Sequence, residues 1–275
     1  MAQLQKGLDL LAGLPDSPWR REHELELRIA LGQALIGAKG YAAPAVGEVF
    51  ARAHVLAVQL NRSDHIVPLL WGQWTFHLAR SELRLALSLA ERIEQIGEVE
   101  DNVVLRLLGH RVHGMTRFHL GEFVAARALF ARCHGLNDPA HRAVDAVLSA
   151  EDPYAVVLAY LAQTLTALGC LDQGRARINE ALREARRLGH VHTLVHVLRR
   201  AALIELATGS PHETQRYAEE MVAISTEHGF AYWFAYGMVS RGSALTALGQ
   251  AQEGLHLITQ GLSMARATGA IIATP

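Results

Sequence analysis

The sequence is poor in cysteine, proline and aromatic residues. Of its 275 residues, 2 are cysteine, 8 are proline and 6% are aromatic. Cys133 and Cys170 form no Cys-x-x-Cys motif, which excludes a disulfide framework and a zinc-binding cysteine pair. We interpret both as small apolar residues in a reducing compartment. Because prolines are so few, helices can run long.

The sequence also has no marked excess of positive or of negative charge. The 26 basic and 27 acidic residues nearly cancel and leave a formal net charge of -1. The chain therefore lacks the positive excess that binds phosphate backbones, and no stripe of aromatic and basic residues compensates for it. We expect no nucleic-acid partner. Since 50% of the residues are hydrophobic, the chain has ample material for a folded core.

Only residues 153–171 form a long run without charge. Gln163 and Thr164 interrupt this run and Gly169 ends it, so its helical part would rise about 24 Å, short of the roughly 30 Å of a bilayer core. We predict a buried helix. The N-terminus carries Asp9 among its leucines and lacks the order of a signal peptide. We therefore expect a soluble, cytoplasmic protein with no membrane partner.

Glycine, by contrast, is abundant and evenly spaced. Six glycines follow one another at twenty-residue intervals: Gly169, Gly189, Gly209, Gly229, Gly249 and Gly269. Glycine readily adopts the left-handed conformation that follows a helix end. Each interval therefore predicts one helix and one turn, and two intervals predict a helical hairpin of about forty residues that repeats.

Small residues recur at fixed distances from every second glycine. They lie seven residues before it and five residues after it, at Ala162, Ala202 and Gly242 and at Gly174, Thr214 and Gly254. Two antiparallel helices approach closely only where side chains are small. We expect the helices of each hairpin to cross at these positions.

The same pattern extends over the N-terminal half and predicts turns near residues 40, 81, 121, 169, 209 and 249. An insertion at about residues 137–153 predicts a short extra helix over 141–150, and residues 1–14 are similar to the second half of a hairpin. We predict a single all-α domain over residues 1–275, a right-handed superhelix of antiparallel hairpins. Because neither end carries a polar capping helix, we expect a chain cut from a longer array that forms a homodimer through its uncapped ends.

One hairpin carries the repeat pattern most completely, with Gly114, Gly121, Phe123, Ala126, Phe130 and Cys133 at its defining positions. This pattern resembles the tetratricopeptide repeat, and the resemblance covers essentially the whole chain. The period is about forty residues and not thirty-four, and the hairpins close with glycine where the usual motif has proline. Both differences are typical of the longer repeats of bacterial signalling proteins.

Four segments carry a narrower resemblance, at residues 14–20, 38–44, 74–78 and 118–123. They are similar to the repeat regions that follow the ATPase domain in bacterial class III adenylate or guanylate cyclases and related ATPase-containing regulators. In that family the repeats are a non-catalytic regulatory arm. The resemblance implies a protein–protein interaction scaffold within a larger signalling ATPase or nucleotide cyclase.

Catalytic motifs are missing from the sequence. Residues 32–40 are glycine-rich, but Ala38 stands where a phosphate-binding loop needs lysine, and Gly40 has no hydroxyl. No nucleophile elbow and no repeated carboxylate pair occurs. We predict no enzyme activity and no cofactor.

The 15 histidines include two pairs at helical spacing, His110 with His113 and His192 with His196. Such pairs can hold a metal. Neither contains the glutamate of His-Glu-x-x-His, and we interpret most histidines as structural or surface residues.

The first helix of each hairpin faces the inside of the superhelix and is the candidate partner-binding surface. Equivalent inward positions hold Trp71, Arg111, Met115, His119, His196, Arg199 and Tyr236. Aromatic residues and arginine are the usual anchors of an interface. The lysine and asparagine clamp of peptide-tail-binding tetratricopeptide proteins has no match at these positions.

We expect the partner to be a protein or peptide segment bound on this concave face. Two alternatives stay open. The aromatic residues could instead form the core between repeats, and the groove could bind a small molecule or a metal through His192, His196 and Arg199 as a sensing module.

Overall fold

The computed structural model describes residues 1–62, 65–135, 138 and 151–271, and within these ranges it contains thirteen α-helices and no strand. The helices are α1 (Ala2–Ala12), α2 (Pro18–Lys39), α3 (Pro44–Gln59), α4 (Ile66–Ala79), α5 (Leu83–Val99), α6 (Val103–His119), α7 (Phe123–Gly135), α9 (Pro153–Ala167), α10 (Leu171–Leu188), α11 (Val191–Ala207), α12 (Pro211–His228), α13 (Ala231–Ala247) and α14 (Ala251–Ala267). The predicted helix over 141–150 lies outside the described residues.

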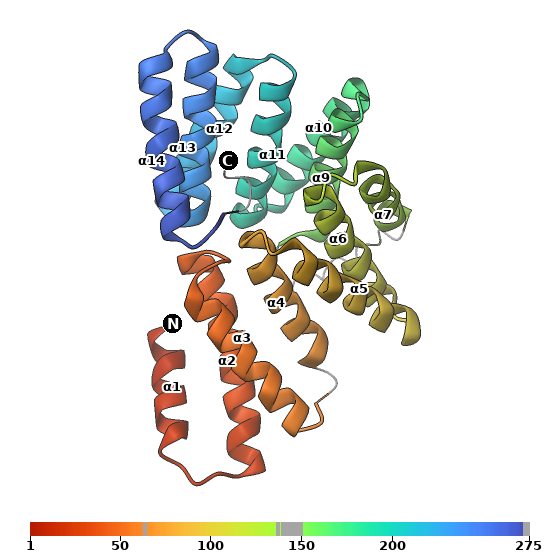
Figure 1. Ribbon diagram of the computed structural model, residues 1–275, viewed down its shortest axis with the longest axis vertical. Coiled ribbons are helices and arrows are strands. Elements are labelled where there is room, and N and C mark those ends of the chain that lie inside the picture. The colour runs from red at the N-terminus through yellow and green to blue at the C-terminus, as the bar shows by residue number, and fades with distance from the viewer. Residues whose placement is uncertain (63–64, 136–137, 139–150, 272–275) are drawn as a thin grey trace.

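Successive helices pack against one another as antiparallel hairpins (Figure 1). The pairs are α2 with α3, α4 with α5, α6 with α7, α9 with α10, α11 with α12 and α13 with α14. The first helices of neighbouring hairpins also touch, since α4 contacts α6, α6 contacts α9, α9 contacts α11 and α11 contacts α13. They form an inner layer, and the prediction of an all-α solenoid is confirmed.

Helix α9 explains the uncharged run at residues 153–171. Of its 15 residues, 11 are buried. Asp152 caps the start of this helix, because its carboxylate accepts a hydrogen bond of 2.8 Å from the Ala155 N–H and Pro153 is the first helical residue. No helix in the described ranges is long and apolar enough to cross a membrane.

The turn glycines have the backbone conformation that their spacing indicates. All six at twenty-residue intervals have positive φ, between 65° at Gly189 and 88° at Gly249. Gly40 and Gly121 have φ values of 88° and 80°, and Ser81 takes the same conformation with a φ of 56°. A helix therefore ends at each of these positions, and the regular helix length follows from their spacing.

Glycine also allows close approach between the two helices of a hairpin. A Cβ atom on Gly242 of α13 would lie 2.6 Å from the carbonyl oxygen of Gly254 on α14. One on Gly261 would lie 2.7 Å from the carbonyl oxygen of Ala235. These distances are shorter than a Cβ contact allows, so the small residues are required where these helices cross.

The two ends of the solenoid meet. The Ile271 N–H, beyond α14, donates a hydrogen bond of 3.0 Å to the carbonyl oxygen of Ala79 at the end of α4. Ala270 packs with Ala42 and Ala79 in a small apolar cluster. In Figure 1 the last hairpin accordingly lies beside the turn between α2 and α3. This contact lies beside a pocket on the inner face, which Tyr41, Ala79 and Tyr232 help to line.

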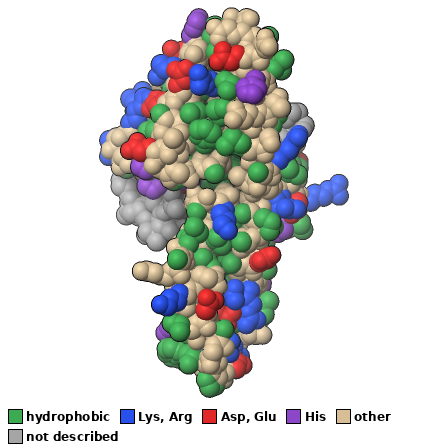
Figure 2. All heavy atoms as spheres, turned by 90° about the vertical axis from the view of Figure 1, so that its left-hand side faces the viewer, with side chains coloured by type: hydrophobic (Ala, Val, Ile, Leu, Met, Phe, Trp, Pro, Cys, Tyr) green, Lys and Arg blue, Asp and Glu red, His purple; other side chains and the backbone are tan. Residues whose placement is uncertain are grey.

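The outer faces of the first and last helices are partly apolar. Leu10 on α1 is 67% exposed and Leu255 on α14 is 58% exposed. Figure 2 views the side of the molecule on which these helices lie and shows hydrophobic side chains among charged ones. Dimerisation through these faces stays a prediction.

The closure can be measured by comparing Gly269→Ala with Gly249→Ala. Both positions have positive φ, at 82° and 88°, so each substitution should cost about 1 kcal/mol of unfolding free energy in backbone strain. Only at Gly269 would the added Cβ meet another segment, the carbonyl oxygen of Ala42 at 2.5 Å. We expect urea unfolding to show a larger loss for Gly269→Ala. Equal losses would contradict a close contact between the two ends.

Candidate functional site

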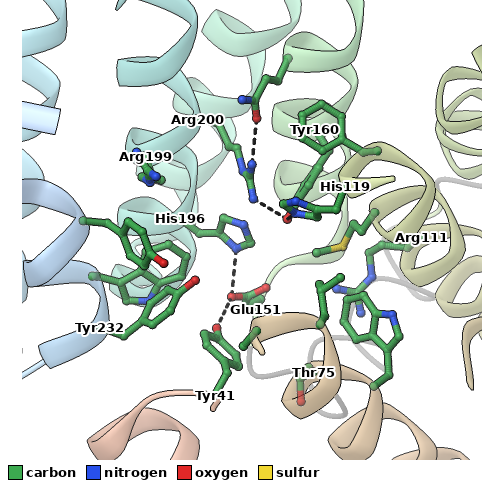
Figure 3. Close-up of a pocket in the computed structure, with 18 of the residues that line it drawn as sticks. Tyr41, Thr75, Arg111, His119, Glu151, Tyr160, His196, Arg199, Arg200 and Tyr232 are labelled. Carbon is green, nitrogen blue, oxygen red and sulfur yellow. Dashed lines mark hydrogen bonds and ion pairs between the residues drawn. The ribbon is translucent and has the colours of Figure 1, made fainter. Parts of the chain in front are cut away.

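A cavity of about 170 Å³ lies where the inner helices converge (Figure 3). Helices α4, α6, α9, α11 and α13 each contribute side chains to its wall. Tyr41, from the turn between α2 and α3, and Glu151, which precedes α9, complete it. We call this space the central cavity. Its lining residues are Tyr41, Trp71, Trp74, Thr75, Leu78, Ala79, Arg111, Met115, Phe118, His119, Glu151, Tyr160, Gln163, His196, Arg199, Arg200, Leu203, Tyr232, Trp233 and Tyr236.

All seven residues predicted for the concave face line the central cavity. Trp71 comes from α4, Arg111, Met115 and His119 from α6, His196 and Arg199 from α11, and Tyr236 from α13. All except His119 are buried in the structure, so they both pack between repeats and face the cavity. Their role in binding a partner stays a prediction.

Several lining residues are absent from the predicted set. Tyr160 and Arg200 could have been found, because each lies nine residues before its turn glycine, Gly169 and Gly209. Tyr41 and Glu151 could not, because one comes from a distant turn and the other from the insertion. No repeat offset relates them to the inner helices.

The Glu151 carboxylate connects side chains from the α2–α3 turn and from helix α11 at the central cavity. Its Oε1 atom accepts a hydrogen bond of 3.0 Å from the Tyr41 hydroxyl and lies 3.1 Å from His196 Nδ1 and 3.2 Å from His192 Nδ1. Because a carboxylate only accepts hydrogen bonds, His196 Nδ1 carries a proton. The Trp233 indole N–H donates to His192 Nε2 at 3.1 Å, which leaves the proton of that neutral ring on Nδ1. One carboxylate thus joins the α2–α3 turn to α11.

Protonation states in this network follow from burial and from its hydrogen bonds. Burial by itself would raise the pKa of Glu151, but His196 and His192 outweigh it and hold this pKa well below the usual range. Burial lowers the pKa of His196 although Glu151 opposes the change. Burial and the Glu151 charge raise the pKa of Tyr41 well above its ordinary value. The arrangement is therefore an ionised carboxylate with neutral donors around it.

Two arginines of α11 point into the cavity without an acidic partner among the described residues. Arg199 is 7% exposed, donates a hydrogen bond of 3.2 Å to Ser240 Oγ, and lies 4.6 Å above the centre of the Tyr236 ring. Arg200 donates to Gln163 Oε1 at 2.8 Å and to the Tyr160 hydroxyl. Burial and the neighbouring Arg200 charge lower the pKa of Arg199 to about 10, so it remains a cation.

The second histidine pair also surrounds a glutamate, outside the cavity. His110 Nδ1 and His113 Nδ1 of α6 lie 2.8 Å and 2.5 Å from the two carboxylate oxygens of Glu94 on α5. These hydrogen bonds hold the pKa of Glu94 well below its usual range. Both pairs thus act as carboxylate partners. In the described ranges no group of three histidine, cysteine or acidic side chains could hold a metal ion.

Two histidines whose pKa is lowered in the folded protein make its stability depend on pH. Burial, with the charge of Arg200, lowers the pKa of His119 well below 6.5, and burial lowers that of His196. The unfolded chain therefore binds more protons below about pH 6.5. We expect the unfolding free energy to fall as the pH drops from 7 to 5.5, by at most about 1.4 kcal/mol per pH unit for each histidine.

Urea unfolding at the two pH values measures this dependence. His119→Gln should reduce the loss, whereas His256→Gln, at an exposed position, should leave it unchanged. A loss that is the same in wild type and His119→Gln would contradict a neutral His119 in the folded protein.

The sequence matches no protein-family model and no curated protein. Among solved structures, a Rap protein complexed with Competence and Sporulation Factor is similar, with a TM-score of 0.68 and 13% identity over 98% of this chain and 72% of the Rap chain. BtubC (BKLC) from P. vanneervenii has a TM-score of 0.52 and 14% identity, over 91% of this chain and 94% of its own. At such low identity these similarities show the fold alone, a solenoid of α-helical hairpins.

Proposed function

We propose that the chain is a non-catalytic scaffold that binds a protein or peptide segment at the central cavity. One observation carries this proposal: five inner helices direct their aromatic and arginine side chains to a single space. Aromatic residues and arginine contribute most of the binding energy in protein interfaces when they line a pocket. The described lining residues present no nucleophile activated by a neighbouring base, which favours binding over catalysis.

The similar Rap structure supports this proposal in a limited way. That protein was solved in complex with Competence and Sporulation Factor, so a solenoid of this shape can hold a binding partner. At 13% identity the similarity shows the fold and not the residues of a binding site. The residues of the central cavity in this chain therefore carry the proposal.

Binding at this place would act on the whole solenoid. The cavity wall includes Tyr41 near the start of the chain and Tyr232 near its end, and their rings meet edge to face with centroids 5.3 Å apart. A segment that inserts between the walls would favour one spacing of the two ends over another. Such differential affinity is what allows a ligand to shift a conformational equilibrium.

We further propose that the chain is the regulatory arm of a larger bacterial signalling ATPase or nucleotide cyclase in the cytoplasm. The resemblance of residues 14–20, 38–44, 74–78 and 118–123 to that family supports this context. An ATPase or cyclase domain encoded in the same reading frame would support it further.

A small-molecule sensor is the second candidate function. The observation that favours it is size, because about 170 Å³ accommodates one ring or one large side chain and no folded element. In both candidates the same residues bind the ligand, and only its source differs.

Selection from a displayed library of random peptides tests the first candidate. We expect enriched peptides whose affinity falls at least tenfold in Trp71→Ala and Tyr236→Ala, because aromatic anchors contribute about 2 kcal/mol or more. Trp19→Ala is the control, since that ring is 56% exposed and lies outside the cavity. Circular dichroism and the milder Trp71→Phe separate loss of binding from loss of folding. Enriched peptides that bind both cavity variants as tightly as wild type would contradict the proposal.

A further inference from the structure

Among the described residues that line the central cavity, the charges of helix α11 are not matched by acidic partners. Arg199 and Arg200 line the cavity, and Glu151 is the carboxylate that the described wall contributes. Glu151 already interacts with Tyr41, His192 and His196. The two arginines of α11 therefore present positive charge to the space between the described residues of the wall.

Arg199 is the clearest case of a buried positive charge without an acidic partner among the described residues. Its guanidinium is buried, and its partners are a serine hydroxyl and a tyrosine ring. A buried cation without an anion is costly, and proteins retain such a group where a ligand supplies the missing charge. Arg200, next along α11, leaves its buried Nε atom without a hydrogen-bond partner in the described part of the chain. Two guanidinium groups on one helix thus offer donors to the same space.

The rest of the wall is suited to an apolar group. Trp71, Trp74 and Trp233 line the cavity with Met115 and Phe118. The volume of about 170 Å³ is close to that of an engineered cavity of about 150 Å³ that binds benzene. The Trp71 indole N–H is buried and has no partner among the described residues, which leaves one further donor.

We propose that the central cavity binds an organic anion, a carboxylate attached to or beside an apolar group the size of one ring, with Arg199 and Arg200 as its anion partners. This inference rests on the proposed function, because it specifies the ligand of the same site. Two sources share this chemistry. A partner segment can present an acidic residue beside an aromatic one, and a free small acid can present both in one molecule.

Calorimetric titration with matched pairs of probes tests the charge and identifies the source. Phenylacetate is compared with phenylacetamide, and a capped phenylalanyl-glutamate peptide is compared with its phenylalanyl-glutamine counterpart. We expect the anionic member of at least one pair to bind ten times or more tightly than its neutral member, since hydrogen bonds to charged groups are the stronger ones. Arg199→Gln should abolish this difference.

Arg186→Gln on the outer helix α10 is the matched control and should leave binding unchanged, because Arg186 pairs with Glu220 away from the cavity. Thermal unfolding of Arg199→Met gives a measurement independent of any ligand. Its midpoint should equal or exceed that of wild type, because the substitution removes a buried cation that has no anion. A purely structural arginine would give a lower midpoint.

The titration results decide whether the cavity binds an anion and from which source. Tight binding of phenylacetate alone supports the anion site and assigns it to free acids, at the expense of the proposed protein partner. Anionic and neutral members that bind equally, or binding unaffected by Arg199→Gln, would overturn the inference while selected peptides could still support the scaffold. Failure of every probe to bind would also overturn it.

Discussion

The central cavity depends on the hydrogen bonds to one buried carboxylate, that of Glu151. The Tyr41 hydroxyl and His196 Nδ1 lie 3.0 Å and 3.1 Å from the same oxygen, and they come from the α2–α3 turn and from helix α11. A buried carboxylate is tolerated only when donors surround it. This requirement fixes the α2–α3 turn against α11. Together with the contact of Ile271 on Ala79, it brings the hairpins together around a small space.

The same packing explains why the site is both apolar and cationic. In a solenoid, residues at equivalent inward positions of successive hairpins face one another, so a few aromatic and basic positions converge when the ends meet. Arg199 on α11 and Trp71 on α4 are far apart in the sequence, yet they line one cavity. The fold supplies the apolar contacts, and the charge of Arg199 is the part that packing alone does not require.

The sequence predicts the helices and the inner face because both depend on local periodicity. Gly169, Gly209 and Gly249 mark helix ends through their backbone conformation, and the repeat places Trp71, Arg111 and Arg199 at equivalent positions before their turns. The closure depends on contacts between residues far apart in sequence, such as Gly269 with Ala42, for which no periodic pattern exists. The histidine pairs were recognisable by spacing. Their partners, Glu94 and Glu151, were not, because each comes from a separate segment of the chain.

The central claim is that the inner helices form one binding site for an anion with an apolar body. A crystal structure of the protein soaked with 4-bromophenylacetate tests it most directly, because the anomalous signal of bromine locates the ring without ambiguity. We predict a single strong peak among Trp71, Trp74 and Trp233, with the carboxylate within hydrogen-bond distance of Arg199. An empty central cavity, or a peak only on the outer helices, would contradict the account.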